Sequence, residues 1–152
     1  MADIHVEEFY KDVAIALVQL YGSFPRRVNV FVEDIAGPDE PDEFGLHSKR
    51  HMACFSALLW LQEEGLLRYV DTIRQEALDQ AVLTQKAFVR LSSPTLEHQA
   101  LPRESVEREA LPDSVQKDLS THIHRIRQAL KSGHSGRISE AVQTAFFEDT
   151  LG

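Results

Sequence analysis

Two histidines and the single cysteine of the chain lie together near its middle, and they are the first candidates for chemistry. His47 and His51 are four residues apart, and Cys54 follows three residues later. Because residues three or four apart share one face of a helix, these side chains could form half of a metal site. Their spacing ties no further histidine, cysteine or carboxylate to them, and an exposed helix start with a buried thiol accounts for the same residues. We therefore expect no metal ion and no cofactor.

Other patterns associated with catalysis are missing from the sequence. The seven glycines form no GxGxxG or Walker loop, and neither a GxSxG nor an HExxH motif is present. His122 and His124 are two residues apart, so on a helix they point in different directions. Residues 133–136 (GHSG) could hold a phosphate through their backbone, but a turn between two helices explains them better. The sequence therefore predicts a protein that is not an enzyme.

One basic pair has a mechanism for binding an anion. Lys49 and Arg50 lie between the two histidines. If a helix starts near Ser48, both side chains lie in its first turn, where the helix dipole and the free N–H groups favour a phosphate. An ordinary solvated helix face is the alternative for the same residues.

The apolar pattern around this pair predicts a helix over residues 47–64. Apolar side chains recur at three- and four-residue steps, as at Met52, Phe55 and Leu58. Gly65 follows two glutamates and supplies a left-handed residue that can end the helix.

The residues after this helix predict an antiparallel pair of strands. Residues 66–70 (LLRYV) have strand-forming content, and apolar character resumes at 81–84 after a polar stretch, 71–80, that we expect to lie outside the core. Thr84 is a good N-cap for a helix that follows the second strand.

Two phrases in this region resemble the winged-helix superfamily. They are LLWLQEEGLL at residues 58–67 and Leu-Thr-Gln-Lys-Ala at 83–87, where the family usually has Leu-Thr-x-Lys-Gly. The resemblance covers about residues 5–92. It implies a mainly α fold with a small antiparallel β-wing, in which a third helix packs on the wing.

The resemblance also implies a DNA-binding face. In helix-turn-helix proteins the start of the second motif helix enters the major groove. Carried over to this chain, the residues that would face bases or phosphates are Ser48, Lys49, Arg50, Ala53 and Ser56.

The first part of the chain agrees with the helix, short strand and helix that the family has before its reading helix. An apolar helical stripe covers residues 3–21, strand-forming residues occupy 28–32, and 34–36 could form a brief second helix. Residues 37–45 (GPDEPDEFG) depart from the family, because a long acidic loop stands where a tight turn is usual. This loop could bind a protein partner.

The remaining sequence divides the chain at about residue 92. We assign residues 1–92 to a winged-helix domain, 93–112 to a linker that carries three prolines, and 113–152 to C-terminal helices. Asp113 is the expected N-cap of the first of these helices.

A stripe in the C-terminal region has two explanations. Its apolar residues are spaced 4, 4, 3 and 4 apart, at Val115, Leu119, Ile123, Ile126 and Leu130. Core packing against the first helix is one explanation. A dimerisation helix is the other, and the resemblance favours it because many winged-helix regulators dimerise through helices outside the wing. We expect a homodimer.

Composition and charge bear on the partner. The chain of 152 residues has a net charge of −8, of which −7 falls in residues 1–43, +1 in 44–91 and −2 in 92–152. No apolar run is long enough to cross a membrane, and a single cysteine suits a cytoplasmic location.

Two functions are compatible with these observations. The first is a DNA-binding transcriptional regulator, which the resemblance favours. The second is an acidic protein-interaction module that has kept the winged-helix fold without binding DNA. Local charge favours the second, because affinity for duplex DNA comes mainly from neutralised phosphates. We take the first as the prediction and keep the second as its alternative.

Overall fold

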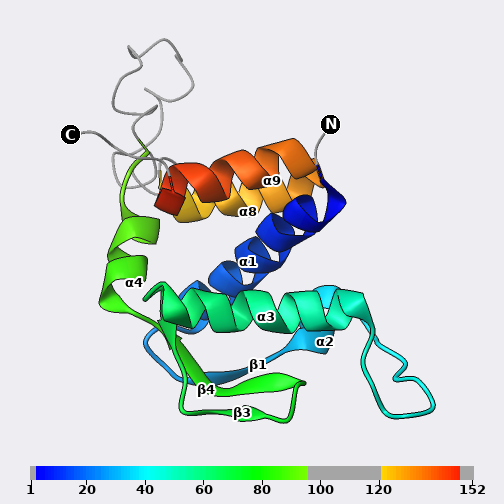
Figure 1. The fold of residues 1–152 in the computed structure, drawn as a ribbon. Helices are drawn as coiled ribbons and strands as arrows, with labels where there is room; N and C mark the ends of the chain where they lie inside the picture. The colour runs from blue at the N-terminus through cyan, green and yellow to red at the C-terminus, as the bar shows by residue number, and fades with distance from the viewer. Residues whose placement is uncertain (1–2, 96–120, 148–152) are drawn as a thin grey trace.

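The computed structural model describes residues 3–95 and 121–147. Within these ranges the protein is mainly α-helical with a small antiparallel sheet, which confirms the predicted fold class (Figure 1). The elements in chain order are α1 (Ile4–Ser23), β1 (Val28–Phe31), α2 (Val32–Ala36), α3 (Lys49–Glu63), β2 (Leu67–Arg68), β3 (Asp71–Ile73), β4 (Ala77–Leu83), α4 (Gln85–Ser92), α8 (His122–Ser132), α9 (Ser135–Val142) and the π-helical turn η1 (Gln143–Phe147).

The predicted helix 47–64 is present as α3. Ser48 is its N-cap, and the Ser48 hydroxyl oxygen accepts a hydrogen bond from the His51 backbone N–H. Gly65 follows the helix with a φ of 76°, a conformation that suits glycine. Leu58 and Leu61 on the inner face of α3 are fully buried.

The sheet is organised around β4, which pairs antiparallel with β1 on one edge and with β2 and β3 on the other. The predicted pair of strands is confirmed, since Leu67 lies opposite Leu83. The prediction that residues 71–80 lie outside the core was wrong for the last part of this stretch. Ala77 and Leu78 are fully buried in β4, because β4 is the central strand and Leu78 faces the core beside Val30.

Thr84 joins the sheet to α4 as the sequence predicts. Its hydroxyl oxygen accepts a hydrogen bond from the Ala87 backbone N–H and donates one to the Gly65 carbonyl at 2.8 Å. One side chain therefore fixes both the start of α4 and the turn after α3.

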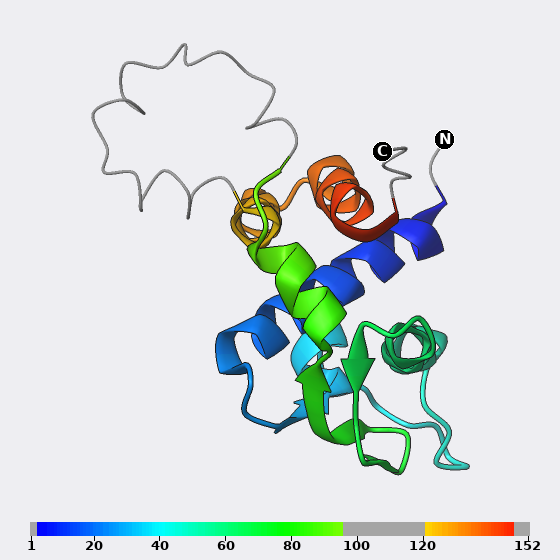
Figure 2. The same cartoon turned by 90° about the vertical axis from the view of Figure 1, so that its left-hand side faces the viewer.

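Helix α1 is the central element of the described structure. Figures 1 and 2 show it between a layer made by α8 and α9 and a layer made by α2, α3 and the sheet, and it contacts elements of both layers. Its buried residues belong to one continuous core with those of the other helices. No helix within the described residues is long and apolar enough to cross a membrane.

The described part of the 115–130 stripe packs inside this chain. Ile123 and Ile126 are 3% and 0% exposed, and Leu130 is half-buried against the same core. Core packing against α1 is therefore the explanation for these residues, and the expected dimerisation role of Ile123 and Ile126 is corrected. Val115, Leu119, the Asp113 cap and most of the expected linker 93–112 lie outside the described residues.

We predict that Ile123→Asp destabilises the monomeric fold instead of dissociating a dimer. A carboxylate at a 3% exposed site loses its hydration without gaining a partner, so the free energy of unfolding should fall by at least about 3 kcal/mol. Urea denaturation followed by far-UV circular dichroism measures the change.

Gln128→Asp is the matched control, because it adds the same charge to an exposed position of the same helix. It should change stability by less than about 0.5 kcal/mol. A wild-type dimer in light scattering that Ile123→Asp converts to a folded monomer would contradict the prediction.

Candidate functional site

The acidic loop that precedes α3 is folded by its own carboxylates. The Asp42 side chain accepts hydrogen bonds from the backbone N–H groups of Phe44 and Leu46, both at 2.9 Å. Asp39 accepts one from the Ser48 backbone N–H at 3.2 Å, which ties the loop to the start of α3. Two acids of the predicted acidic loop, Asp39 and Asp42, therefore determine its shape.

Four of the five residues predicted to contact DNA lie on the outer surface. Ser48, Lys49, Ala53 and Ser56 are exposed, as a binding face requires. Of these four, Lys49 carries a positive charge.

Arg50, the fifth of them, reaches back to α1 instead. Its Nη1 donates to Asp12 Oδ2 at 2.7 Å and its Nη2 donates to Asp12 Oδ1, so the pair is bidentate. Its Nε lies 3.5 Å from Glu8 Oε2. Asp12 is 1% exposed, and its hydrogen bond raises the pKa of Arg50. The structure therefore uses Arg50 to neutralise a buried carboxylate.

The hairpin formed by β3 and β4 adds negative charge beside this helix. Asp71 and Asp79 are direct partners across the two strands, and Glu76 is exposed at the turn. Arg74 is the opposing charge in this hairpin, at the same turn. Like charges directly opposite one another repel, so this surface favours a cation over a phosphate.

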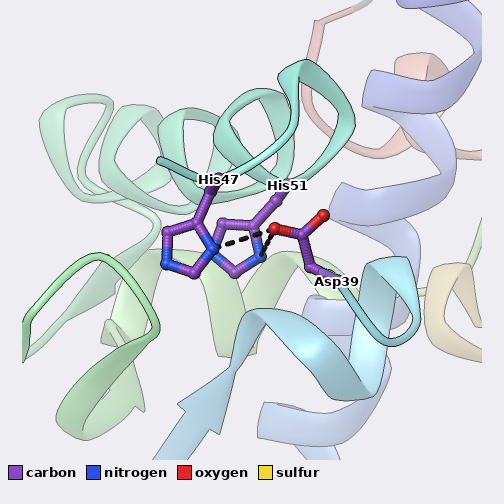
Figure 3. Close-up of side chains that lie close together, drawn as sticks. All are labelled: Asp39, His47 and His51. Atoms are coloured by element: carbon purple, nitrogen blue, oxygen red, sulfur yellow. Dashed lines mark hydrogen bonds and ion pairs between the residues drawn. The ribbon is translucent and has the colours of Figure 1, made fainter. Parts of the chain in front are cut away.

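A cluster that the sequence spacing did not indicate lies where the loop meets α3. Asp39, His47 and His51 each offer one ligand atom, and these atoms lie within 4.8 Å of one another (Figure 3). Asp39 Oδ2 is 2.9 Å from His47 Nδ1 and 3.8 Å from His51 Nδ1. The two imidazole rings are stacked, with centroids 3.8 Å apart and an interplanar angle of 8°.

The carboxylate of this cluster is strongly stabilised in its charged form. Hydrogen bonding from the Ser48 side chain is the largest cause that lowers the pKa of Asp39 to about 2. The hydrogen bonds from His47 and from the Ser48 backbone act in the same direction, as does His51 whenever it carries a proton on both nitrogens, whereas burial opposes them. Asp39 is therefore a carboxylate at any pH near neutrality.

His51 is the buried member of the cluster, at 4% exposed. Its Nε2 lies 2.7 Å from the backbone carbonyl oxygen of Gln75. Because a carbonyl oxygen can only accept, Nε2 carries the proton of this hydrogen bond. The other nitrogen, Nδ1, is buried and has no hydrogen-bond partner in the part of the chain that the structure describes.

Cys54 does not join the two histidines. Its side chain is fully buried in the hydrophobic core, and burial raises the pKa of its thiol to about 12, with a further contribution from Asp12. The sequence explanation of a buried thiol is confirmed. The predicted turn between two helices at 133–136 is also confirmed. Gly133 ends α8 with a φ of 68°, and α9 begins at Ser135.

The remaining histidines of interest do not form a joint site. His122 is 1% exposed, and burial, followed by the charges of Arg90 and Arg125, lowers its pKa to about 4. His124 is half-buried on another face of α8. His122 is therefore an uncharged core residue at neutral pH.

No protein-family model, curated protein or solved structure matches the chain. The function is accordingly argued from the geometry and charge described above.

We predict that Cys54 in the native protein resists a thiol reagent. With a pKa of about 12, against an ordinary value of 9.0, its reactive thiolate is about a thousandfold rarer than that of a free thiol at pH 8. Absorbance after addition of an aromatic disulfide should show reaction only once denaturant is present.

Cys54→Ala combined with Ala53→Cys is the matched control, because it moves the thiol one residue along α3 to an exposed position. This variant should react at once in the folded state. Equally fast reaction of the folded wild type would show that α3 is oriented differently.

Proposed function

We propose that this protein is a winged-helix protein-interaction module, without catalytic activity, whose acidic surface binds a basic segment of a partner protein. The order of α1, β1, α2, α3 and the sheet strands agrees with the family that the sequence resembles. Fold resemblance alone would favour DNA, so the choice depends on the surface. A cytoplasmic location, which the single cysteine suggests, is part of the proposal.

The observation that carries the choice is the pairing of Arg50 with Asp12. Arginine and lysine side chains supply most of the affinity for duplex DNA by neutralising phosphates. Releasing Arg50 to a phosphate would leave the carboxylate of Asp12 buried without a cationic partner, at a cost of about 3–5 kcal/mol. This cost exceeds the binding free energy that one phosphate contact supplies. Helix α3 therefore offers Lys49, but not Arg50, to a phosphate.

The surroundings of α3 support the same choice. The loop at 37–45 carries four carboxylates, and the β3–β4 hairpin adds Asp71, Glu76 and Asp79 against Arg74. Phe44 and Leu46 at the end of the loop are 78% and 63% exposed. Exposed aromatic and aliphatic side chains within a charged rim are typical of protein-binding surfaces.

The alternative is the DNA-binding regulator. It is favoured by the shared outer face of Ser48, Lys49, Ala53 and Ser56. On this alternative, duplex DNA would bind at low salt, and Lys49→Ala with Arg50→Ala would flatten the salt dependence by about two units, roughly one per lost phosphate contact.

Fluorescence anisotropy with two labelled probes separates these functions. We expect no binding to mixed-sequence duplex DNA at about 50 mM salt, and salt-dependent binding to a short peptide rich in lysine and arginine. The variant Asp71→Asn, Glu76→Gln and Asp79→Asn should weaken peptide binding about tenfold, since each exposed pair contributes roughly 0.5 kcal/mol.

The control removes the same number of charges elsewhere, through Asp3→Asn, Glu7→Gln and Glu63→Gln. It should bind the peptide like the wild type. If both variants lost the same peptide affinity, net charge alone would explain the binding. That result would count against a defined binding surface. Duplex binding with the salt dependence described above would favour the regulator.

A further inference from the structure

Two acceptor atoms face each other in the cluster of Asp39, His47 and His51. His51 donates through Nε2 to the Gln75 carbonyl, so in the neutral ring Nδ1 holds a lone pair. Within the described residues that lone pair is buried without a hydrogen-bond partner, and the carboxylate oxygen Asp39 Oδ2 lies 3.8 Å from it. Two acceptors at this distance repel each other unless a cation lies between them, and the buried Nδ1 atom is not reached by bulk water.

A proton on His51 Nδ1 would give an ion pair with Asp39 alone, whereas a metal ion would also use the third ligand atom that converges on this point. The His47 and His51 imidazoles are stacked at 3.8 Å, and His47 already points Nδ1 at the same carboxylate oxygen (Figure 3). A metal ion binds both Nδ1 atoms once one of the two nearly parallel rings rotates so that both lone pairs point at the ion.

We propose that Asp39 Oδ2, His47 Nδ1 and His51 Nδ1 form a binding site for a divalent transition metal of the zinc class. Two imidazole nitrogens and one carboxylate oxygen suit zinc, whereas magnesium and calcium prefer oxygen ligands throughout. Ligand atoms around a tetrahedral zinc ion lie roughly 3.3 Å apart, because each bond is about 2.0–2.1 Å long. The distances of 2.9 and 3.8 Å from Asp39 Oδ2 bracket that value.

The surroundings provide the outer partners that metal-bound histidines usually have. The Nε2–H of His51 is held by the Gln75 carbonyl, which fixes the tautomer that leaves Nδ1 free. Asp39 also accepts the Ser48 backbone N–H. On binding, the ion replaces the proton between His47 Nδ1 and Asp39 Oδ2. The His47 ring takes up a proton from solvent at Nε2 and stays neutral.

The ion would join three separate parts of the structure. Asp39 and His47 lie at the two ends of the acidic segment before α3, His51 lies in the first turn of α3, and Gln75 lies in the β3–β4 turn. Three protein ligands leave the fourth tetrahedral position for water or for a side chain of a partner. This site does not depend on the interaction role proposed above.

Isothermal titration of the untagged full chain with zinc chloride, after treatment with a chelator, tests the site. We expect one ion per chain with micromolar or tighter affinity. Asp39→Asn and His47→Gln should each weaken binding by at least about 100-fold, more than loss of an outer partner does. Both substitutions lie in the segment before α3, and circular dichroism confirms that the variants are folded.

Two exposed histidines outside the cluster give matched controls. His5→Gln and His134→Gln should keep one zinc ion at wild-type affinity. Nitrogen NMR of the wild type needs no variant, and zinc should shift the Nδ1 signals of His47 and His51 while the Nε2–H of His51 is retained.

Absence of stoichiometric zinc binding by the folded wild type would overturn the site. So would wild-type affinity in Asp39→Asn and His47→Gln, or a zinc-induced shift confined to His5 or His134. A His51 ring protonated at both nitrogens in the presence of excess zinc would assign the cluster to an ion pair.

Discussion

The structure depends on a carboxylate buried at the centre of the molecule. Asp12 lies on the face of α1 that packs into the core, and its charge is matched by the guanidinium of Arg50 from α3. A buried ion pair adds little to stability compared with an apolar pair, but removing one partner is costly. The pair therefore fixes how α3 lies on α1, together with the edge-to-face contact of Phe9 and Trp60, whose ring centroids are 5.2 Å apart. Because of this pair, Arg50 is not available at the surface for binding DNA.

The start of α3 is held by a second set of acids. Asp39 and Ser48 satisfy backbone donors there, and Asp42 shapes the loop that leads in. Negative charge at a helix N-terminus is favourable because of the helix dipole. The position that would attract a phosphate is thus already occupied by a carboxylate of the same chain. The remaining exposed surface, with Phe44 and Leu46 beside acidic groups, suits a protein partner.

Local signals in the sequence predicted much of the fold. Ser48, Gly65 and Thr84 act through neighbouring residues, so the ends of α3 and the start of α4 could be placed from the sequence. Leu78 was missed because its burial comes from β1, which lies far along the chain. The packing of Ile123 on α1 was left open for the same reason, since an apolar stripe does not state what covers it.

The candidate site was harder to predict because its contacts are distant in sequence. Arg50 and Asp12 are separated by 38 residues, and no spacing rule joins them. One signal was available, since Asp12 stands three residues after Phe9 and four before Ala16 on an apolar face. A carboxylate there requires a partner. Asp39 could not be linked to His47 and His51, because a loop of irregular shape lies between them.

A double-mutant cycle of Asp12→Ala and Arg50→Ala tests the central claim most directly. The free energies of unfolding of the wild type, both single variants and the double variant give the coupling between the two side chains. We predict that each single variant loses about 3 kcal/mol and that the double variant loses little more than either, which corresponds to a coupling energy of about 2–3 kcal/mol. A coupling energy near zero would show that Arg50 is free at the surface, and would contradict the account.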